Sequence, residues 1–596
     1  MKSFEDFLAF SMLTFEQLSW LKMMWLTVGL LMLMGVLYGG ANVDVCYYWG
    51  LLALPVPVWA SIRCSQKRMN QKKLATLHAC WGRVTDRKRD FTDIASLSAY
   101  EVDQAGDSRI DDQTWSDLHM DDVYTRMDTT LTSPGQSVLY RMLRTPLHSE
   151  DTLRQRDQVI QLFQVNQIVR EGIQMDLLRL GKERTAGIAA LVWGPVPAVT
   201  RLRHVCTSLA FIALLVPALG YCLSSLGPIV VLMLLTYLIN ALVTHALRRH
   251  YLFYLSSIRY MGSMIRVARS LAELNAPGLE PYSQSLKTAA MACESIAQKT
   301  FLLRPEDALS SDLGTFVYGH LNIYFLREVR IYFAVVDRLR TCQRELQTVY
   351  TLLGELDALV SVASFRQYWG DYLTEPVFTE QEVFLEVRDL IHPLIPDPVP
   401  NSVTVTGQGV TVTGSNMAGK TTFLRTLGVN AILAQTVYMV LASYYRTRFF
   451  RIVSSLSEHD DLLAEKSYYL VEAENLLRMI KAAEQGPLTL CLIDEPLAGT
   501  NSRERIVASQ GILNYLIKHH ALVVTTTHDL NLAHALEPDY ASIHFTDDVG
   551  PQGLRFDYIL RLGIATTTNA ITLLDYLDYP AEIVLQAKQQ LDNPKA

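Results

Sequence analysis

The longest hydrophobic stretches begin near the N-terminus and predict a pair of membrane-spanning helices. Met23–Asn42 contains no charged residue, and its length is about that of a helix crossing the apolar core of a bilayer. After a short break at 42–44, the run Val45–Ile62 is again uncharged, with Trp49 and Trp59 toward its ends. A group of basic residues follows at once: Arg63, Lys67, Arg68, Lys72 and Lys73.

A second uncharged region, Val205–Thr244, is long enough for two further spans and is interrupted by small and turn-forming residues at 224–228. Basic residues flank it on both sides: Arg201 and Arg203 before it, Arg248 and Arg249 after it. Two hairpins with basic outer flanks and short turns follow the positive-inside rule, which predicts that both termini are cytoplasmic. We therefore expect a multi-pass protein of the cell (inner) membrane.

Other interpretations of these apolar runs remain open. A helical hairpin buried in a large soluble core would also be apolar, and Pro55 and Pro57 weaken the second run as a helix. A cleaved signal peptide fits poorly, because Glu5, Asp6 and Glu16 precede the first run and no basic segment does. A transporter would be indicated by ionisable residues within the spans, and the four runs contain none.

Length and composition narrow the picture. A chain of 596 residues exceeds a single hydrophobic core, so we expect roughly three or four structural units. The net charge of −7 argues against a globally basic nucleic-acid binder. The 8 cysteines show no C-x-x-C spacing and no associated histidine cluster, so we expect reduced thiols and no zinc site.

The C-terminal part of the chain contains a glycine loop between a predicted strand and a predicted helix. Val403–Thr413 alternates apolar and polar residues and predicts a hairpin whose second strand is Gly409–Thr413. A G-x-x-x-x-G-K-T segment follows, and such a loop points backbone N–H groups and a helix N-terminus at a phosphate. We expect Lys420 at the β/γ-phosphates of ATP and the Thr421 hydroxyl on Mg²⁺. The predicted nucleotide-binding residues are Gly414, Ser415, Asn416, Met417, Ala418, Gly419, Lys420, Thr421 and Thr422.

Two later apolar runs end in side chains suited to hydrolysis. Leu488–Ile493 precedes Asp494 and Glu495, and Leu522–Thr526 precedes His528 by one residue. The C-terminal ends of parallel strands form the edge of a sheet at which α/β proteins place their sites. Asp494 suits the Mg²⁺ shell, and Glu495 suits a general base that polarises the attacking water. His528 suits a residue that senses the γ-phosphate or orients the water.

The Asp-Glu pair and the downstream histidine together indicate an ABC-type ATPase core, in which two nucleotide sites form between paired domains. A transporter ATPase would carry an L-S-G-G-Q segment before Asp494, and the interval from Lys420 to Asp494 contains none. The helical stretch Ser467–Glu472 stands in its place.

These motifs resemble those of the MutS family of DNA mismatch repair ATPases. Thr413–Thr422 (TGSNMAGKTT) is similar to the family's phosphate loop, and Ser467–Glu472 is similar to its signature segment. Asp494–Asn501 (DEPLAGTN) resembles its Asp-Glu-x-Gly-Arg-Gly-Thr-Ser stretch, and 525–528 its switch histidine. The resemblance implies a homodimer with composite sites, in which Ser467 reaches the nucleotide of the partner subunit.

The resemblance extends beyond the nucleotide site. Asp128–Gly135 is similar to the start of the family's helical core, Glu355–Leu359 to the end of its lever helix, and Tyr558–Gln590 to its tail. We expect an α/β ABC-type P-loop ATPase domain and an all-α helical core and lever domain, with two transmembrane helical hairpins. The predicted domains are a membrane hairpin at 1–75, a linker or connector at 76–118, the helical core and lever at 119–385 with the second hairpin at 205–244, and the ATPase domain with a C-terminal helical tail at 386–596.

Several positions depart from the family pattern. No mismatch-reading domain is expected, because the first hundred residues are assigned to a membrane hairpin and a short linker. Phe384–Glu386 has the spacing of the family's Phe-x-Glu wedge, but we interpret it as a strand. Ala498 stands where the family has arginine, and Asn501 where it has serine. Hydrolysis is still expected, whereas control by DNA is left open.

Two classes of function remain. Basic runs at 63–73, 83–89 and 248–249 each lie near a predicted span, where contact with anionic lipid headgroups accounts for them without DNA. The first class is a membrane-anchored MutS-family ATPase that binds mismatched or branched DNA, as in DNA mismatch repair. The second is a mechanochemical ATPase that acts on a membrane or protein partner without DNA. ATP and Mg²⁺ are the expected cofactors in both.

Overall fold

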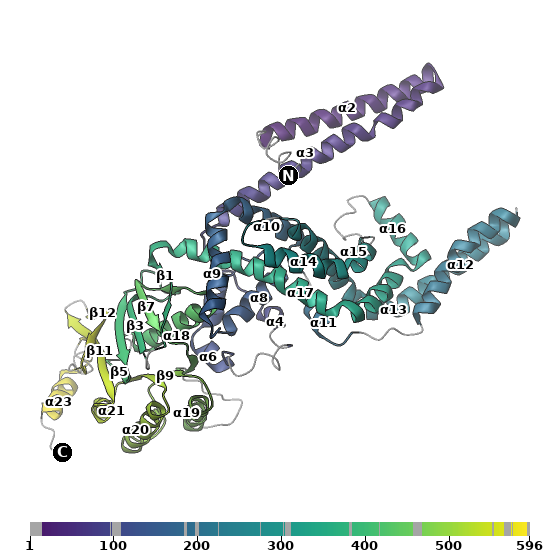
Figure 1. Cartoon of the computed structure of the whole chain (residues 1–596). Helices are drawn as coiled ribbons and strands as arrows, with labels where there is room; N and C mark the ends of the chain where they lie inside the picture. Colours follow the sequence, from purple (N-terminus) through teal and green to yellow (C-terminus); the bar gives the residue numbers. More distant parts are fainter. Residues whose placement is uncertain are drawn as a thin grey trace. The chain divides into compact units, whose positions relative to one another are not determined.

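The computed structural model describes residues 15–95, 97, 100, 109–183, 187–196, 202–223, 226–274, 276–301, 303, 312–380, 384–415, 418–456, 468–550, 553–565, 574, 576–577 and 579–592. They divide into two compact units. The first contains residues up to Trp81 together with Gln167–Arg179, and the second contains Gly82–Asn166 and the chain from Leu180 onward. Figure 1 shows the elements of both units.

The first unit is an elongated helical pair with a short third helix. It contains α2 (Phe15–Asn42), the 3-10 helix η1 (Val45–Ala53), α3 (Pro55–Cys80) and α10 (Gln167–Leu180). The helical run expected over Val45–Ile62 is divided into η1 and α3 at Pro55, which lacks the N–H needed to continue a preceding helix and occupies the first turn of α3. The His78–Glu171 contact (Nε2 to Oε1, 2.5 Å) joins α3 to α10.

The second unit begins with a group of helices, most of which pack against α17 (Arg327–Trp369), a long helix that is kinked at Cys342. The others are α4 (Phe91–Ile94), α6 (Asp112–Asp117), α7 (Met120–Met127), α8 (Ser133–Arg144), α9 (Glu150–Val165), α11 (Ile188–Trp193), α12 (Leu202–Leu223), α13 (Leu226–Ala272), α14 (Glu280–Ala292), α15 (Glu294–Thr300) and α16 (Asp312–Phe325).

The two segments that resemble the start of the helical core and the end of the lever lie against each other. Asp357 of α17 accepts hydrogen bonds from the backbone N–H groups of Leu131 and Thr132 and from the Thr132 hydroxyl, just before α8 begins. At Gly135 the start of α8 lies so close to α17 that a side chain would not fit, because a Cβ there would be 2.1 Å from the Asp357 carboxylate. Burial nevertheless raises the pKa of Asp357 to about 6, against the opposing effect of these hydrogen bonds.

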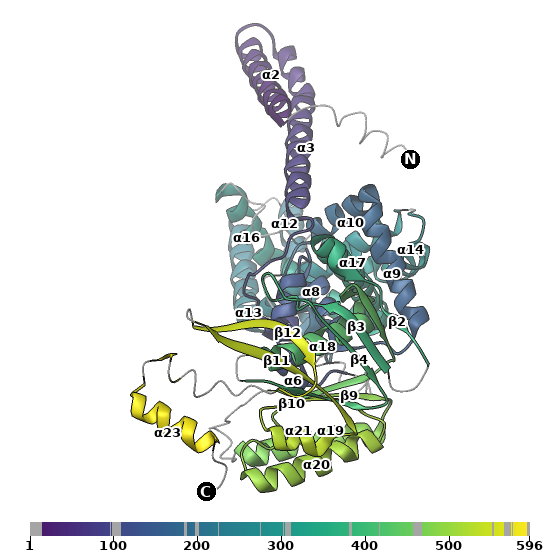
Figure 2. The ribbon, with the colours of Figure 1, turned by 90° about the vertical axis from the view of Figure 1, so that its left-hand side faces the viewer.

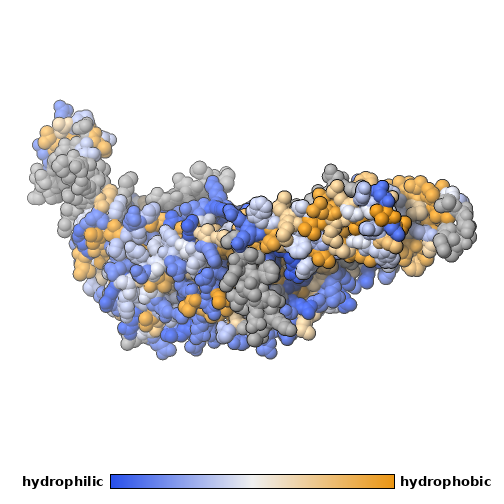
Figure 3. Space-filling view, turned by 90° about the horizontal axis from the view of Figure 1, so that it is seen from above, coloured by the Kyte–Doolittle hydropathy of each residue, from blue (hydrophilic) through white to orange (hydrophobic). Residues whose placement is uncertain are grey.

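Five helical segments are long and apolar enough to cross a membrane, judged by length and composition among the described residues. They are Phe15–Asn42, Val45–Cys80, Leu202–Leu219, Gly227–Leu247 and Arg327–Tyr372. The last is largely buried inside the protein, whereas the other four are largely exposed. Figure 3 shows hydrophobic side chains gathered over the arm formed by α12 and α13.

The remainder of the second unit contains three sheets. Their strands are β1 (Leu373–Thr374), β2 (Val377–Phe378), β3 (Phe384–Leu390), β4 (Asn401–Thr406), β5 (Gly409–Thr413), β6 (Val440–Leu441), β7 (Tyr444–Thr447), β8 (Arg451–Ser455), β9 (Thr489–Asp494), β10 (Leu522–Thr527), β11 (Tyr540–Gly550) and β12 (Gly553–Leu562). The largest sheet has the order β12-β11-β5-β10-β9-β8 and is parallel except at the β11–β12 pair. Its strands β5, β9 and β10 carry the predicted site residues at their C-terminal ends.

The hairpin predicted over Val403–Thr413 is wrong. The strands β4 and β5 form as expected, but β4 pairs with β3 in the four-stranded sheet, whereas β5 lies between β10 and β11 in the six-stranded sheet. The alternation in β4 buries Val403 and Val405 on one face, which fixes a strand but not its partner. Phe384–Glu386 begins β3, so its interpretation as a strand is confirmed.

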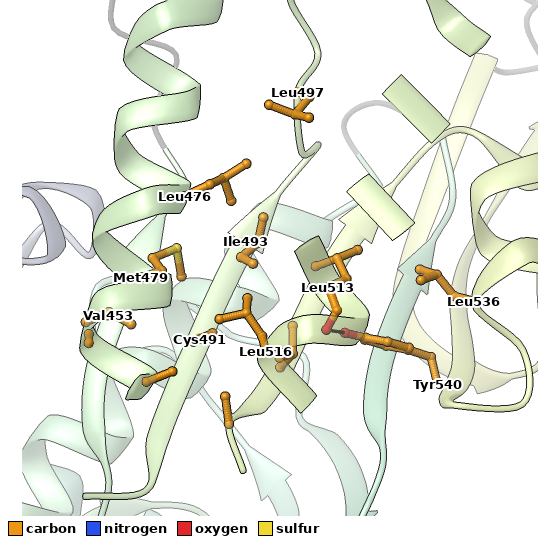
Figure 4. Close-up of a cluster of buried hydrophobic side chains, with 14 of the residues drawn as sticks. Val453, Leu476, Met479, Cys491, Ile493, Leu497, Leu513, Leu516, Leu536 and Tyr540 are labelled. Carbon is orange, nitrogen blue, oxygen red and sulfur yellow. Dashed lines mark hydrogen bonds between the residues drawn. The ribbon is translucent and has the colours of Figure 1, made fainter. Parts of the chain in front are cut away.

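Helices cover both faces of the six-stranded sheet (Figure 2). One face carries α18 (Lys420–Val437), and the other carries α19 (Tyr468–Gln485), α20 (Ser502–Lys518) and α21 (Leu530–Leu536), while α23 (Ala581–Asp592) follows the last strand. Under the second face, Cys491 and Ile493 of β9 pack with Met479, Leu513 and Leu516 (Figure 4). This core holds β9 and β10 in place, so that the carboxylates at the end of β9 are presented at a fixed edge.

Candidate functional site

The glycine loop connects β5 to α18 through backbone conformations that suit glycine. Gly414 and Gly419 have φ values of 144° and 102°, and the left-handed region is costly for other residues. A Cβ on Gly414 would also lie 2.8 Å from the Phe545 carbonyl. The loop makes a turn in which the Ala418 N–H donates to the Ser415 carbonyl (3.3 Å), and α18 begins at Lys420. Asn416 and Met417 lie outside the described residues.

The Lys420 side chain folds back over this loop. Its Nζ donates to the Gly414 carbonyl at 2.9 Å and to the Ser415 carbonyl at 3.3 Å. The same atom lies 3.5 Å from the Glu495 carboxylate, and the lysine is buried. The side chain predicted to meet the terminal phosphates therefore lies against the first residues of the loop, Gly414 and Ser415.

Thr421 and Asp494 meet although 73 positions separate them in sequence. The Thr421 hydroxyl donates to Asp494 Oδ2 at 2.5 Å, and the Thr526 hydroxyl at the end of β10 donates to the other carboxylate oxygen. Burial raises the pKa of Asp494, while these two hydrogen bonds and the nearby Lys420 charge act in the opposite direction. Thr526 was not among the predicted site residues, since its position among three consecutive threonines gives no signal for this contact.

Glu495 and His528 form the second pair at this edge. His528 Nδ1 lies 2.8 Å from Glu495 Oε2, and the His528 N–H donates to the same oxygen at 3.2 Å. The other carboxylate oxygen of Glu495 faces Lys420 Nζ at 3.5 Å and has no hydrogen-bond partner among the described residues. The buried Ser415 hydroxyl also has none among them, as is expected where a polar ligand completes the site.

A cavity of about 680 Å³ opens beside these residues. Ser415, Gly419, Lys420, Thr421, Thr422, Asp494 and Glu495 line one part of it. The remaining lining comes from the segment after β3 and from the last strands, including His392, Pro396, Asn401, Phe545 and Tyr558. The size is within the range of small-molecule sites. Lys420, Asp494 and Glu495 lie together in one part of the cavity, whereas rings and apolar groups, with Asp397 among them, line the remainder.

His392 and Asn401 shape the less charged end of the cavity. Burial lowers the pKa of His392 to about 4, with smaller effects from Arg425, His119 and Arg126, so the ring is neutral near pH 7. Its Nδ1 accepts from the Leu394 N–H at 3.2 Å. Asn401 Nδ2 donates to the Tyr558 carbonyl at 2.9 Å and ties β4 to β12. Neither residue was among the predicted site residues.

A glutamate on α19 supports the loop that follows Glu495. Glu472 accepts hydrogen bonds from the Ala498 and Gly499 N–H groups, both at 3.1 Å. The predicted signature segment thus contacts the loop after the carboxylate pair within one chain. Ser467 itself lies outside the described residues.

The residues present fit a magnesium nucleotide. A threonine hydroxyl and a carboxylate 2.5 Å apart are oxygen ligands of the type that Mg²⁺ prefers. A buried lysine at a helix N-terminus suits the phosphates, and the unsatisfied Ser415 hydroxyl lines the same cavity.

Comparison with known proteins agrees with this geometry. The family model described as MutS domain V matches residues 410–594. A DNA mismatch repair protein MutS 2 of Halobacterium salinarum is 27% identical over 279 residues, which are 45% of this chain and 31% of that protein. A DNA mismatch repair protein MutS of Thermus thermophilus is 29% identical over 269 residues, 44% of this chain and 32% of that protein.

A human relative shows the same extent of similarity. The MutS protein homolog 4 of Homo sapiens is 27% identical over 285 residues, covering 44% of this chain and 30% of that protein. The chain thus spans about a third of the length of these curated relatives. The matched residues include the candidate site residues at the edge of the sheet and all of β5 except Gly409. Residues 410–594 of the chain therefore form a domain that matches MutS domain V.

Proposed function

We propose that this protein binds and hydrolyses ATP with Mg²⁺ at the edge of its six-stranded sheet. The observation that carries the proposal is the meeting of Lys420, Thr421, Asp494 and Glu495, from β9 and from the start of α18, at one end of a cavity of about 680 Å³. Members of the MutS family are ATPases, which supports the same assignment.

The loop and the start of α18 would hold the nucleotide phosphates. Backbone N–H groups at the start of α18 would face them, and Lys420 would exchange its contacts with loop carbonyls for contacts with phosphate oxygens. Thr421 and Asp494 would hold Mg²⁺, Asp494 through water. Bound Mg²⁺ supplies neutralisation of the phosphate charge during transfer.

Glu495 would act on the attacking water. Its carboxylate is held by His528 on one oxygen and lies near Lys420 on the other. A carboxylate in this position accepts the proton of the water or orients it. His528 is about half exposed and contacts Glu495 directly, so it is placed to position this base and to respond to the terminal phosphate.

We further propose that the protein acts as a homodimer anchored in the cell (inner) membrane, with its ATPase domain in the cytoplasm. The four exposed apolar helical segments support the anchor. The resemblance of 467–472 to the family's signature segment supports a site completed by Ser467 of the partner subunit. Closure of two ATPase domains would then be transmitted along α17.

Substitutions at Lys420 and Thr421 test the nucleotide site. The full chain, purified in a neutral detergent, should bind ATP and release phosphate in the presence of Mg²⁺. Lys420→Ala should abolish ATP binding, because the buried positive charge at the phosphates is lost. Thr421→Ala should lower hydrolysis with a weaker effect on binding, and Thr421→Ser should retain activity because the hydroxyl remains. ATP binding by Lys420→Ala equal to that of the wild type would overturn the site assignment.

Two alternatives remain for what the ATPase acts on, and a different observation supports each. The relatives are named as DNA mismatch repair proteins, which favours mismatched or branched DNA. The exposed apolar helices favour a membrane or protein partner without DNA. The ATPase rate should be compared without DNA and with homoduplex, mismatched and branched DNA at two salt concentrations. Stimulation of the ATPase rate by DNA that weakens with salt supports action on DNA. An unchanged rate together with no binding of DNA excludes that alternative.

A further inference from the structure

We propose that a cavity between α12, α15 and α17 binds a phosphate-bearing anion, and that its source is an anionic phospholipid headgroup. The cavity has a volume of about 310 Å³ and is separate from the nucleotide site. Four cationic side chains line it: Arg203, Lys299, Arg327 and Arg330. Thr207 adds a hydroxyl, and apolar groups of α17 form the remaining wall.

The lining of the cavity is cationic. No aspartate or glutamate lines it in the described part of the chain, and Arg203 forms an ion pair with Asp337 at 2.9 Å. Lys299 donates to the Ala334 carbonyl at 3.3 Å. Burial, with the nearby Arg338 and Arg203, lowers the pKa of Lys299. Cations from three helices that converge on one cavity favour a bound anion.

The cavity lies where the apolar helices join the helical core. Arg203 belongs to the first turn of α12, immediately before the uncharged run that begins at Val205. Arg327 and Arg330 belong to the first turn of α17, directly after α16. The cations therefore stand at the base of the α12–α13 arm seen in Figure 1, where its hydrophobic surface begins.

The helix α16, which precedes α17, packs against the arm. Asn240 Nδ2 donates to the Tyr324 carbonyl at 2.6 Å, and the Tyr237 hydroxyl lies 2.7 Å from His320 Nδ1. These contacts attach α16 to the middle of the apolar segment Gly227–Leu247. Of the helices of the arm, α12 contributes Arg203 and Thr207 to the lining of the cavity.

This position identifies the source of the phosphate. If α12 and α13 span a bilayer, as the proposed function holds, their basic ends lie at the depth of the headgroups, where pockets between helices bind anionic lipids. A cavity of about 310 Å³ admits a headgroup phosphate, whereas a DNA duplex requires an extended basic surface along its backbone. The lipid assignment alone rests on the proposed membrane anchor.

Thermal unfolding of the full chain in a neutral detergent tests the site. The unfolding midpoint should be titrated at constant ionic strength with four probes: dioctanoyl phosphatidylglycerol, dioctanoyl phosphatidylcholine, inorganic phosphate and a short DNA duplex. The test variant is Lys299→Gln with Arg330→Gln. The control is Lys287→Gln with Arg344→Gln, which removes the same charge from exposed positions of α14 and α17 that do not line the cavity.

Phosphatidylglycerol should raise the midpoint of the wild type and of the control equally. The test variant should need roughly tenfold or more of this lipid for the same shift, since each basic residue near an anionic surface contributes about 1 kcal/mol. Retained stabilisation of the test variant by ATP would show that it is folded. Phosphatidylcholine should act weakly on all three proteins.

Other results would overturn the proposal or part of it. Equal weakening in the test and control variants would show a general charge effect and no site. Inorganic phosphate acting as strongly as the lipid, with the same dependence on the cavity, would keep the anion site and exclude the lipid assignment. Salt-sensitive binding of the duplex that is weakened in the test variant would show that the cavity binds nucleic acid and would overturn the lipid assignment. Extraction of the protein from membranes by alkaline carbonate would refute the anchor separately, because the phosphate titration does not depend on it.

Discussion

Glu495 combines an unusual backbone conformation with contacts on both carboxylate oxygens. Its φ of 47° lies in the left-handed region, which is costly for a residue with a side chain. The conformation is held because the Glu495 N–H donates to the Thr526 carbonyl at 3.2 Å while His528 contacts the carboxylate. Strain of this kind occurs where a side chain must be aimed at a site, and here it directs Glu495 toward the cavity beside Lys420.

Glu495→Gln should bind ATP and hydrolyse it at least about 100-fold more slowly, because the amide keeps the shape of the side chain but cannot act as a base. Phosphate release gives the rate, and nucleotide binding measured on the same protein is the control for folding. His528→Asn should cause a smaller decrease, since the base remains. A rate within about threefold of the wild type for Glu495→Gln would exclude this residue as the general base.

His392 makes the stability of the protein depend on pH below neutrality. Its pKa is lowered from 6.5 to about 4 in the folded state, so the unfolded chain binds more protons between these values. The contribution of His392 to the free energy of unfolding is therefore fully present above about pH 6.5. It is lost as the pH falls toward 4, by up to about 3 kcal/mol.

His392→Asn should reduce that loss, because the amide oxygen can still accept from the Leu394 N–H and does not titrate. Denaturation midpoints of both proteins at intervals from pH 7 to 4 measure the difference, and all other groups titrate in both. Parallel curves for the two proteins would show that His392 does not cause the dependence of stability on pH.

At the scale of elements, the C-terminal end of α17 is joined to the C-terminal end of α18. Arg366 of α17 forms a buried ion pair with Asp157 of α9 at 2.6 Å. It also donates to the carbonyls of Val437 and Tyr438, at 2.7 and 3.0 Å, where α18 ends. Since α18 begins at the glycine loop, one arginine links the helix of the nucleotide site to the long helix of the core.

Arg366→Met should destabilise the second unit by about 3–5 kcal/mol, because it leaves the Asp157 charge and two helix-end carbonyls buried without this partner. Arg344→Met, at an exposed position of the same helix, should stay within about 0.5 kcal/mol of the wild type. Denaturant unfolding of the two variants makes the comparison. Equal effects would show that the buried ion pair makes no particular contribution.

Sequence patterns identified elements better than partners. The apolar run at 488–493 predicts a buried strand, and β9 forms there at Thr489–Asp494. The strand β4 was also expected, but its pairing with β3 in a separate sheet was not. Alternation reports which face of a strand is buried, whereas the choice of partner depends on distant segments that the local pattern does not contain.

At the scale of the whole molecule, the proposed cycle requires two chains. The second unit contains the nucleotide cavity, the long helix α17 and the apolar arm within one compact body. ATP bound between two ATPase domains would therefore act on the arm through α17 and its contact with α18. Ser467 is the residue by which each chain would complete the site of the other.

The Glu495→Gln protein should become dimeric with ATP and Mg²⁺, because slow hydrolysis preserves the closed state. Light scattering in detergent, corrected for the detergent mass, gives the mass of the protein. Ser467→Arg should weaken this dimer without abolishing ATP binding, since the substitution places a bulky charge at the proposed contact. A monomeric mass for Glu495→Gln under saturating ATP would count decisively against composite sites.

The sequence by itself determined the chemistry that is local along the chain. The glycine loop, the carboxylate pair and the uncharged runs are each contained in one short segment, whose residue types and spacing have a direct physical meaning. The tertiary structure decided what lies next to what. It brings the Thr421 hydroxyl to Asp494, Thr526 to the same carboxylate, and Arg203 to the side of Arg327 and Arg330 around one cavity. Such contacts depend on the packing of helices and strands far apart in the sequence, and for that reason no single segment could reveal them.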